Sequence, residues 1–283
     1  MKDKTIEKIK KDGINSYIET HRFAKHKVKH LMKKYATAYY SGQALIEDED
    51  FEYLIQTLKV LDKDDEYLQK SGWGYKLKNG KKHLYGKVGT LNYYFDFKKI
   101  EETFKDDKKI VIMPKFDGIN FALYYKDGNL LYCLTRGDGY KGKDITKKYK
   151  NHLLKIPKEF EKSDFGIVGE IILEKDASVK IKPRDYVAKI INSHFLDNEK
   201  LSFMPFGFLY NPLQDKPDYL SQLETLDKFL DSKIERISFD FLPDFATMEK
   251  IYKDYQTKYF IDGLVISNLD KSKQVALKFA KDC

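Results

Sequence analysis

Residues 110–134 read IVIMPKFDGINFALYYKDGNLLYCL, and this stretch decides the fold class. The short apolar run Ile110–Met113 predicts a buried strand. Two further strand patterns, Ile119–Tyr125 and Leu130–Leu134, flank the turn signal Lys126-Asp127-Gly128-Asn129. Because two strands joined by such a short turn run antiparallel, the stretch favours an antiparallel sheet.

More strand patterns and several helix-like segments follow. The other strand candidates are Phe165–Leu173, Phe203–Tyr210, Phe260–Ile266 and Gln274–Phe279, and the helix-like segments lie near 98–105, 183–192, 221–232 and 246–256. Hairpins and irregular loops join the strands, which do not alternate strictly with helices. We therefore predict a mostly antiparallel α+β domain and not a doubly wound parallel sheet.

The first part of the chain has a helical pattern instead. Apolar and aromatic residues recur at helical spacing from Ile14 to Lys34. A second helix is expected from about Asp48 to Leu61, because acidic residues open the segment and apolar residues share one face. Ser71-Gly72-Trp73-Gly74 then breaks the pattern. We therefore predict a helical domain over residues 1–72 and a second domain over residues 73–283.

The composition is that of a globular chain with a modest positive charge. Of the 283 residues, 42% are hydrophobic, which supports a sizeable core and excludes global disorder. The two cysteines, Cys133 and Cys283, exclude a disulfide scaffold and a four-cysteine zinc site and suit a reducing compartment. With no signal sequence and no apolar run of about 20 residues, we expect a soluble, cytoplasmic protein. The net charge of +8 fits either a solvated lysine-rich surface or attraction to a polyanion such as nucleic acid.

The motif Lys115-Phe116-Asp117-Gly118 directly follows the first predicted strand. The end of a buried strand is an unusual place for a lysine. Its amine is a nucleophile only when neutral, so we expect burial or nearby cations to lower its pKa from about 10.4. Gly118 permits a tight turn and the close approach of a phosphate-bearing ligand. Taken alone, the motif also fits a surface turn after a strand.

Later segments repeat this combination of ionisable residues and apolar runs. Residues 135–146 read TRGDGYKGKDIT, which fits a loop shaped against a polar ligand or a flexible polar loop. Glu170, Asp262 and Lys278 each interrupt a strand-like apolar segment. A buried charge is costly unless it has a partner, which would be a ligand or a core salt bridge. Together these interruptions predict several strands that converge on one charged ligand.

Five short motifs resemble, in order and spacing, the nucleotidyltransferase motifs of DNA ligases. They are KFDG (115–118), TRGDGYKGKDIT (135–146), GEI (169–171), IDGLVI (261–266) and ALKF (276–279). The long second motif resembles that of the NAD-dependent bacterial type. The resemblance extends over essentially the whole chain. It implies an ATP-grasp-like ligase adenylation fold for the second domain and a first domain that binds nicotinamide mononucleotide (NMN).

The resemblance implies a catalytic group of charged residues. Lys115 would attack the α-phosphate of NAD, expel NMN and hold AMP through a phosphoramide bond. Lys278 would contact the α-phosphate, where phosphoryl transfer needs charge stabilisation, and Asp262 would organise the phosphate and metal region. The implied metal is Mg²⁺ with several retained waters and no assigned protein ligand. The AMP would then pass to a 5′-phosphate at a nick in duplex DNA.

The resemblance also implies residues that bind the nucleotide. Asp117, Arg136 and Glu170 would engage the ribose and position the nucleotide. Phe206 and Val265 would cover the two faces of adenine. The other implied contacts with NAD come from Thr90, Leu91, Met113 and Arg184 in the second domain and from Tyr39, Tyr40, Asp48, Phe51 and Glu52 in the helical domain.

The sequence departs from the family pattern at several positions. Met113 stands where the family has Glu, and Ser267 stands where the family has Lys. Met113 would either remove one polar contact on the adenine side or move it to the backbone. Ser267 would let Asp117 take a different orientation. Two arginines of the family have no clear match, and their expected substitutes are Asn192 or His194 and Lys253 or Lys258.

Three functions follow from these patterns. The first is the NAD-dependent adenylation module of a DNA ligase, whose nick sealing would need an OB-fold and further clamp domains, from a longer protein or a separate polypeptide. The departures at Met113 and Ser267 leave an ATP-dependent DNA or RNA ligase as an alternative. The third is a non-catalytic nucleic-acid-binding module, which fits the positive charge but leaves Lys115, Glu170 and Lys278 unexplained.

Overall fold

The computed structural model describes most of the chain as two compact units. The described residues are 3–21, 24–40, 45–46, 48–69, 79–149, 154–175, 182–192, 200–212, 218–230 and 233–279. The N-terminal unit contains the described residues up to Lys82 together with Gly137–Lys143, and the C-terminal unit contains His83–Arg136 and the described residues from Asp144 onward. The predicted domain boundary near residue 72 lies outside the described residues.

The described part of the N-terminal unit is helical apart from one short strand pair. Its elements are α1 (Lys4–Asp12), α2 (Ile14–Thr20), α3 (Ala24–Tyr40), α4 (Asp48–Leu61), α5 (Glu66–Gln69), and the antiparallel pair β1 (Lys81–Lys82) and β6 (Lys141–Gly142). Helix α4 has the predicted bounds. The helical pattern from Ile14 to Lys34 belongs to two helices, because His21 adopts an extended backbone that ends α2. Helix α1 was not predicted, and it buries Ile6 and Ile9 in the core of this unit.

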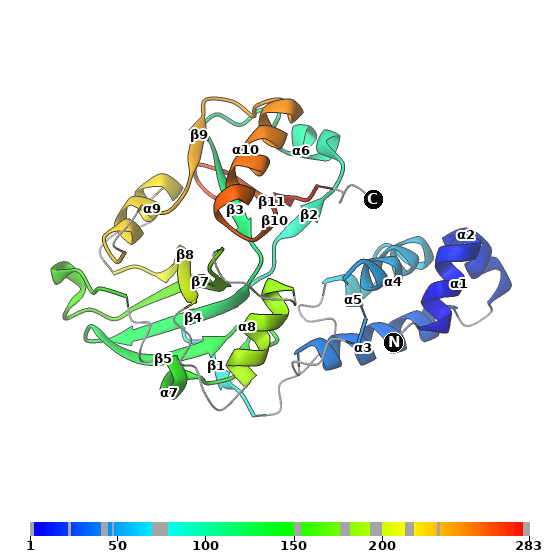
Figure 1. Ribbon diagram of the computed structural model, residues 1–283, viewed down its shortest axis with the longest axis horizontal. Helices are drawn as coiled ribbons and strands as arrows, with labels where there is room; N and C mark the ends of the chain where they lie inside the picture. Colours follow the sequence, from blue (N-terminus) through cyan, green and yellow to red (C-terminus); the bar gives the residue numbers. More distant parts are fainter. Residues whose placement is uncertain are drawn as a thin grey trace. The chain divides into compact units, whose positions relative to one another are not determined.

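The C-terminal unit contains two sheets, which Figure 1 shows. Their strands are β2 (Asn92–Tyr94), β3 (Ile110–Phe116), β4 (Ile119–Lys126), β5 (Asn129–Thr135), β7 (Phe165–Leu173), β8 (Leu201–Tyr210), β9 (Ile237–Phe239), β10 (Ile261–Asn268) and β11 (Gln274–Leu277). The strand orders are β2-β11-β10-β3-β9 and β5-β4-β7-β8. Of the described pairings in these sheets, β11 with β2 is parallel and the others are antiparallel. The prediction of a mostly antiparallel α+β domain is confirmed.

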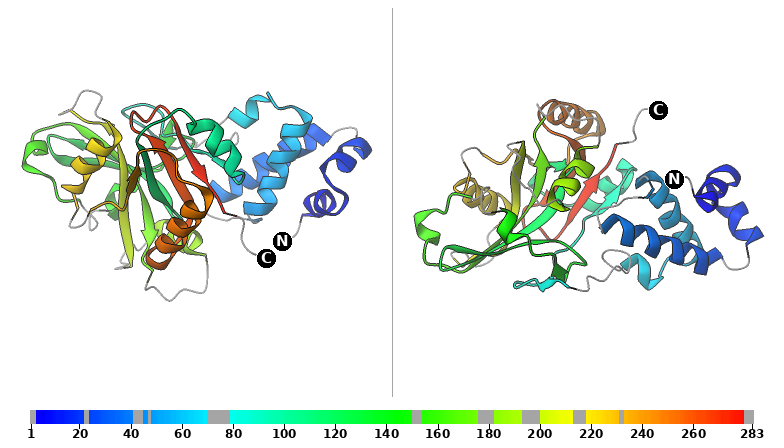
Figure 2. Two further views of the ribbon diagram at one scale, coloured as in Figure 1. Left: turned by 90° about the horizontal axis from the view of Figure 1, so that it is seen from above. Right: turned by 60° about the horizontal axis from the view of Figure 1, so that its bottom comes forward.

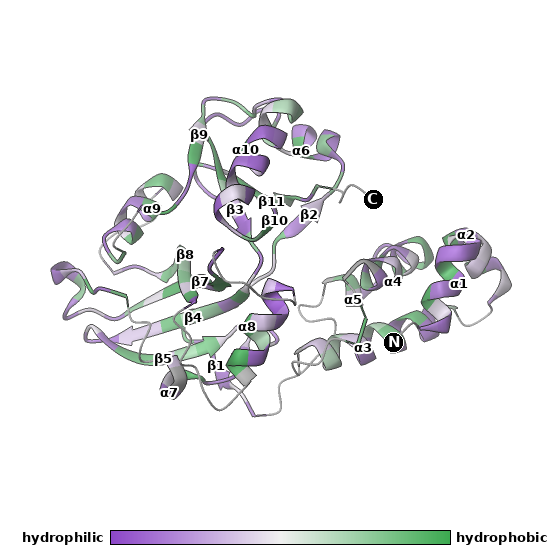
Figure 3. Ribbon diagram, in the orientation of Figure 1, coloured by the Kyte–Doolittle hydropathy of each residue, from purple (hydrophilic) through white to green (hydrophobic). Residues whose placement is uncertain are grey.

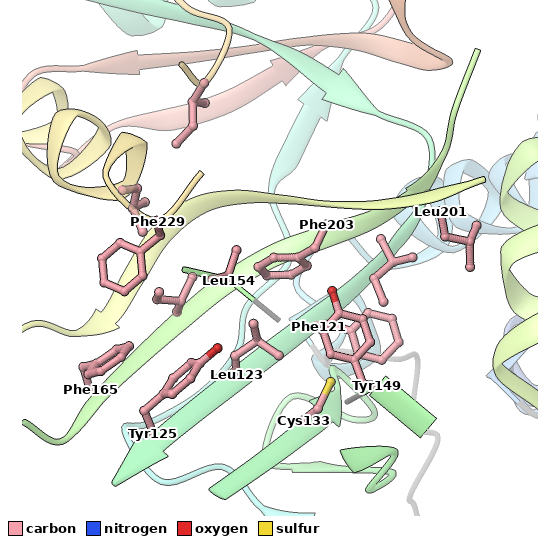
Figure 4. Close-up of a cluster of buried hydrophobic side chains, with 14 of the residues drawn as sticks. Phe121, Leu123, Tyr125, Cys133, Tyr149, Leu154, Phe165, Leu201, Phe203 and Phe229 are labelled. Carbon is pink, nitrogen blue, oxygen red and sulfur yellow. The ribbon is translucent and has the colours of Figure 1, made fainter. Parts of the chain in front are cut away.

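Helices pack against both sheets. They are α6 (Phe97–Phe104), α7 (Thr146–Tyr149), a 3₁₀ turn (Lys158–Phe160), α8 (Pro183–Asn192), α9 (Tyr219–Asp227) and α10 (Phe245–Lys258). Helices α6 and α10 share a core with the five-stranded sheet. Helices α8 and α9 contribute to a larger core with the four-stranded sheet, and Figure 4 shows its aromatic centre around Phe121 and Tyr149. No helix within the described ranges combines the length and the apolar character needed to cross a membrane.

Strand β3 lies between the two cores. Ile110 and Ile112 point into the core with α6 and α10, whereas Val111 and Met113 belong to the larger core. Successive side chains of a strand point to opposite faces, so a strand covered on both faces reads as a continuous apolar run. This burial explains the run that the sequence shows. Strand β7, which is buried along most of its length, is likewise mainly hydrophobic in Figure 3.

The turn at Asp117-Gly118 carries the chain from the five-stranded sheet to the four-stranded one, as Figures 1 and 2 show. The backbone N–H of Asp117 donates to the carbonyl of Phe260 over 2.9 Å, which ties the turn to the start of β10. A Cβ built on Gly118 would lie 2.2 Å from the carbonyl oxygen of Ile171. Only glycine lets the backbone pass β7 at this distance. The turn therefore fixes the end of β3 next to β7 and β10.

A Gly118→Ala variant is expected to lose about 1–3 kcal/mol of unfolding free energy, because its methyl group can fit only if β4 or β7 shifts. Urea unfolding followed by circular dichroism measures the change. Gly89→Ala is the matched control, since a Cβ at Gly89 meets no atom within 4 Å. Equal stability of the two variants would show that β4 and β7 separate at little cost.

Candidate functional site

Lys115 and Asp262 form an ion pair at the centre of the candidate site. Lys115 lies near the end of β3, and its Nζ donates to Oδ1 of Asp262 over 2.7 Å. Their side chains are 24% and 27% exposed, so the pair is reachable from solvent. Strand β10 pairs with β3 and places Gly263 opposite Lys115, with a register shift between Ile261 and Gly263. This irregularity lies at Asp262, and such bulges redirect side chains.

Lys278 is the second cation on Asp262. It follows β11, and its Nζ lies 3.0 Å from Oδ2 of the same carboxylate. The ammonium also lies 4.9 Å from the ring centroid of Tyr93, on β2. Gly263 permits the close approach of β10 and β11, since a Cβ there would lie 2.3 Å from the carbonyl oxygen of Leu277. One carboxylate therefore holds two ammonium groups side by side.

Glu170 is the acidic residue that interrupts β7. It lies opposite Asn120 of β4 and Met204 of β8 in the four-stranded sheet. Desolvation raises the pKa of Glu170 to about 7, although the positive charge of Lys115 opposes this shift. The negative charge of Asp117 adds to the rise in the pKa of Glu170. The positive charge of Arg136 lowers this pKa, with a smaller effect than that of Lys115. The structure thus brings Lys115, Asp117, Arg136, Glu170 and Asp262 into one electrostatic group.

The charge state of Lys115 differs from the sequence-based prediction. Burial lowers the pKa of the amine, but attraction by Asp262, Glu170 and Asp117 outweighs this effect and raises the pKa above its ordinary value. The prediction of a lowered pKa was therefore wrong for this arrangement. Asp262 is ionised, because the two lysines outweigh desolvation and lower its pKa. Lys115 accordingly carries a proton that it must lose before it can act as a nucleophile.

An apolar surface beside the charged group carries the residues expected to face a nucleobase. Phe206 lies on β8 and Val265 on β10, and both are partly buried against the larger core. Val265 pairs with the buried Met113 of β3. The hydroxyl of Tyr219, on α9, lies 3.1 Å from Sδ of Met113 and 3.2 Å from the carbonyl oxygen of Phe206. Tyr219 was not singled out from the sequence, where no motif contains it.

The remaining predicted residues of this unit lie on α8, before β2 and on α10. Arg184 lies in the first turn of α8, where desolvation lowers the pKa of its guanidinium while Asp262 attracts the charge. Thr90 and Leu91 lie in the segment that leads into β2. Lys253 and Lys258, expected to supply a missing charge, are exposed on α10 and pair with Glu249 and Glu235. They do not join the group around Asp262.

The two sequence departures have different structural consequences. Ser267 is buried, and its hydroxyl donates to the carbonyl oxygens of Asn268 and Lys273 over 3.0 and 3.3 Å. It is thus engaged with the turn after β10. Met113 is closed in by Tyr219 and Val265. His194 and the side chain of Asn192 lie outside the described residues.

The residues expected to bind NMN belong to the N-terminal unit. Tyr39 and Tyr40 end α3, while Asp48, Phe51 and Glu52 lie in the first two turns of α4. Helices α3 and α4 pack together, and Phe51 lies against the core of the unit. The side chains of Tyr40 and Asp48 lie outside the described part of the chain.

The described residues do not contain a protein-ligated metal site. No group of three or more His, Cys, Asp or Glu side chains among them is arranged to hold an ion. The two oxygens of Asp262 each contact a lysine. An ion held mainly by protein carboxylates therefore does not fit this arrangement.

Comparison with known proteins gives consistent matches. The family model described as "NAD-dependent DNA ligase adenylation domain" matches residues 90–281. A DNA ligase from Mycoplasma genitalium is 31% identical over 274 residues, covering 83% of this chain and 40% of that protein. A DNA ligase from Pelagibacter ubique is 28% identical over 229 residues, covering 69% of this chain and 33% of that protein. The chain thus spans between a third and two fifths of the length of these curated relatives.

Solved structures resemble the chain more weakly. An archaeal ATP-dependent RNA ligase, form 1, has a TM-score of 0.49 and 16% sequence identity, covering 72% of this chain and 50% of that one. The family match, in contrast, includes the Lys115 motif and the residues that converge on it. This chain belongs to the family of NAD-dependent DNA ligase adenylation domains.

Proposed function

We propose that the chain catalyses its own adenylation with NAD as the donor. Nζ of Lys115 attacks the α-phosphorus of NAD, a P–N bond forms, and the bond from that phosphorus to the bridging oxygen breaks. NMN leaves with this oxygen on its phosphate, and the proton of the amine passes to solvent. The observation that carries the proposal is the shared ion pair of Lys115 and Lys278 on Asp262.

The two lysines would have different roles in this step. Lys115 is the nucleophile, and Asp262 holds its amine in place until the donor arrives. Lys278 supplies a fixed positive charge beside the nucleophile, where negative charge on the α-phosphate needs stabilisation. Asp117, Arg136 and Glu170 would position the ribose. The surface formed by Phe206 and Val265 would hold the adenine.

The other binding partners also belong to the proposal. We propose that Tyr39, Tyr40, Asp48, Phe51 and Glu52 bind the NMN half, and that Thr90, Leu91 and Arg184 contact the nucleotide. Mg²⁺ would be held by phosphate oxygens and water, which is a common mode for this ion. The acceptor of the AMP would be a 5′-phosphate at a nick in duplex DNA. Sealing would use an OB-fold and clamp domains supplied by other domains or by a separate chain.

The deciding experiment is the intact mass of the purified chain before and after incubation with NAD, with and without Mg²⁺. We expect the mass of one AMP to be added and NMN to be released. A gain with ATP and none with NAD would favour an ATP-dependent ligase, which the departures at Met113 and Ser267 make the second candidate. No gain with either donor would contradict both proposals.

The rate of adduct formation is expected to rise between about pH 6 and 9. Because its neighbours raise the pKa of Lys115, the neutral amine is a small fraction at pH 7, and this fraction grows about tenfold per pH unit. Glu170, with a pKa of about 7, ionises over the same range. Single-turnover rates at saturating NAD measure the dependence. A rate that falls as pH rises would show that a protonated group is needed instead.

A further inference from the structure

Lys271 lies in the tight turn between β10 and β11. Its φ of 60° is in the left-handed region, and its N–H donates to the carbonyl of Asn268 over 3.1 Å. Asn268 also pairs with Lys273 through backbone and side chain, so several hydrogen bonds hold the turn. The start of α9 is tied to the turn as well, because the N–H of Tyr219 donates to the carbonyl of Leu269 over 2.7 Å. The base of the Lys271 side chain therefore has a fixed position.

The ammonium of Lys271 reaches the surface proposed to hold adenine. Its Nζ lies 4.5 Å from the ring centroid of Tyr219, whose hydroxyl contacts Met113 and the carbonyl of Phe206. A Cβ built on Gly207 would lie 2.9 Å from the same Nζ. Gly207 directly follows Phe206 on β8. A residue larger than glycine at this position would displace the ammonium from β8.

No anion balances this cation within the described part of the chain. Desolvation alone lowers the pKa of Lys271 to about 8, with no carboxylate acting on it. Lys273, two residues later, pairs with Asp107 over 2.6 Å, and both lysines at the centre of the site pair with Asp262. A desolvated cation without a counter-charge is unfavourable, and the ring of Tyr219 offsets only part of the cost. A ligand that accepts a hydrogen bond from the ammonium would offset the rest.

We propose that Lys271 recognises the base of the nucleotide, by donating a hydrogen bond to an acceptor nitrogen of the adenine that lies against Phe206. This inference rests on the proposed function, which places adenine on that surface. Met113 and Ser267, the two departures from the family pattern, do not offer a side-chain hydrogen bond to the adenine. Met113 is apolar and enclosed, and the hydroxyl of Ser267 is engaged by the backbone of the turn. The turn after β10 thus supplies the polar contact from a position outside the family motifs.

The test compares Lys271→Met with Lys273→Met, which removes a lysine of the same turn that points to Asp107. Calorimetry with adenosine measures binding of the base without phosphate. We expect Lys271→Met to weaken adenosine binding and to raise the NAD concentration that gives the half-maximal single-turnover rate of adduct formation, each by about tenfold, with the limiting rate changed less than about twofold. Lys273→Met should bind adenosine as the wild type does. Because methionine removes a desolvated charge, Lys271→Met should unfold at the wild-type temperature or higher.

Each outcome decides the inference. Unchanged adenosine binding in Lys271→Met would overturn it, and so would an equal loss in both variants or a wild-type chain that does not bind adenosine. A lower unfolding temperature with unchanged binding would make Lys271 structural. If the wild type binds adenosine but gains no AMP from NAD, the proposed adenylation fails. The role of Lys271 in base binding is then still decided by the calorimetry.

Discussion

A Lys115→Arg variant is expected to form no covalent AMP adduct with NAD. Arginine keeps the positive charge and can keep the contact with Asp262, which in the wild type spans 2.7 Å. A guanidinium stays protonated at any working pH, because its pKa lies above about 12. It therefore offers no nitrogen lone pair to the α-phosphate of NAD. The substitution removes the proposed nucleophile while it preserves the charge balance around Asp262.

Intact mass after prolonged incubation with NAD and Mg²⁺ measures this loss. Lys258→Arg is the matched control, because Lys258 also pairs with a carboxylate, Glu235 at 2.8 Å, but lies on the exposed face of α10. The control should gain one AMP as the wild type does. Both variants should unfold near the wild-type temperature, which separates loss of chemistry from loss of fold. An adduct on Lys115→Arg would place the nucleophile elsewhere in the chain.

The sequence predicted the residues of the site well where strand pairing brings these residues next to one another. The apolar run before Lys115 predicted a buried strand, and β3 is covered on both faces. Asp262 and Lys278 interrupt two other predicted strands. Because β10 pairs with both β3 and β11, these interruptions fall next to Lys115. Buried ionisable residues in neighbouring strands could thus be grouped into one site before the sheet order was known.

The sequence was less informative where the outcome depends on contacts distant along the chain. A lowered pKa for Lys115 was expected from burial, but three carboxylates brought in by the fold reverse the shift. Lys271 lies outside every motif, and its proposed role depends on α9 and β8, which the fold brings next to its ammonium. Lys253 looked available as a substitute cation, yet helix geometry pairs it with Glu249 one turn away.

A Lys278→Met variant is expected to form the AMP adduct about 10²–10³-fold more slowly than the wild type. Lys278 shares Asp262 with Lys115, so the substitution leaves the carboxylate with Lys115 as its one ion-pair partner of the two. This makes the proton of Lys115 harder to remove. It also deletes the positive charge that would stabilise the α-phosphate as negative charge develops there. Both effects slow the formation of the AMP adduct.

Single-turnover rates over a range of NAD concentrations separate the contributions. If Lys278 acts in the transition state, the limiting rate falls and the apparent dissociation constant of NAD changes little. Lys253→Met, which removes an exposed lysine from α10, should behave as the wild type does. Raising the pH should restore part of the loss, because it supplies neutral Lys115 without replacing the missing charge. If the variant binds NAD more weakly but keeps the wild-type limiting rate, Lys278 only contacts bound NAD before the reaction. Asp262 and Lys115 would then be the charged residues that act in the transition state.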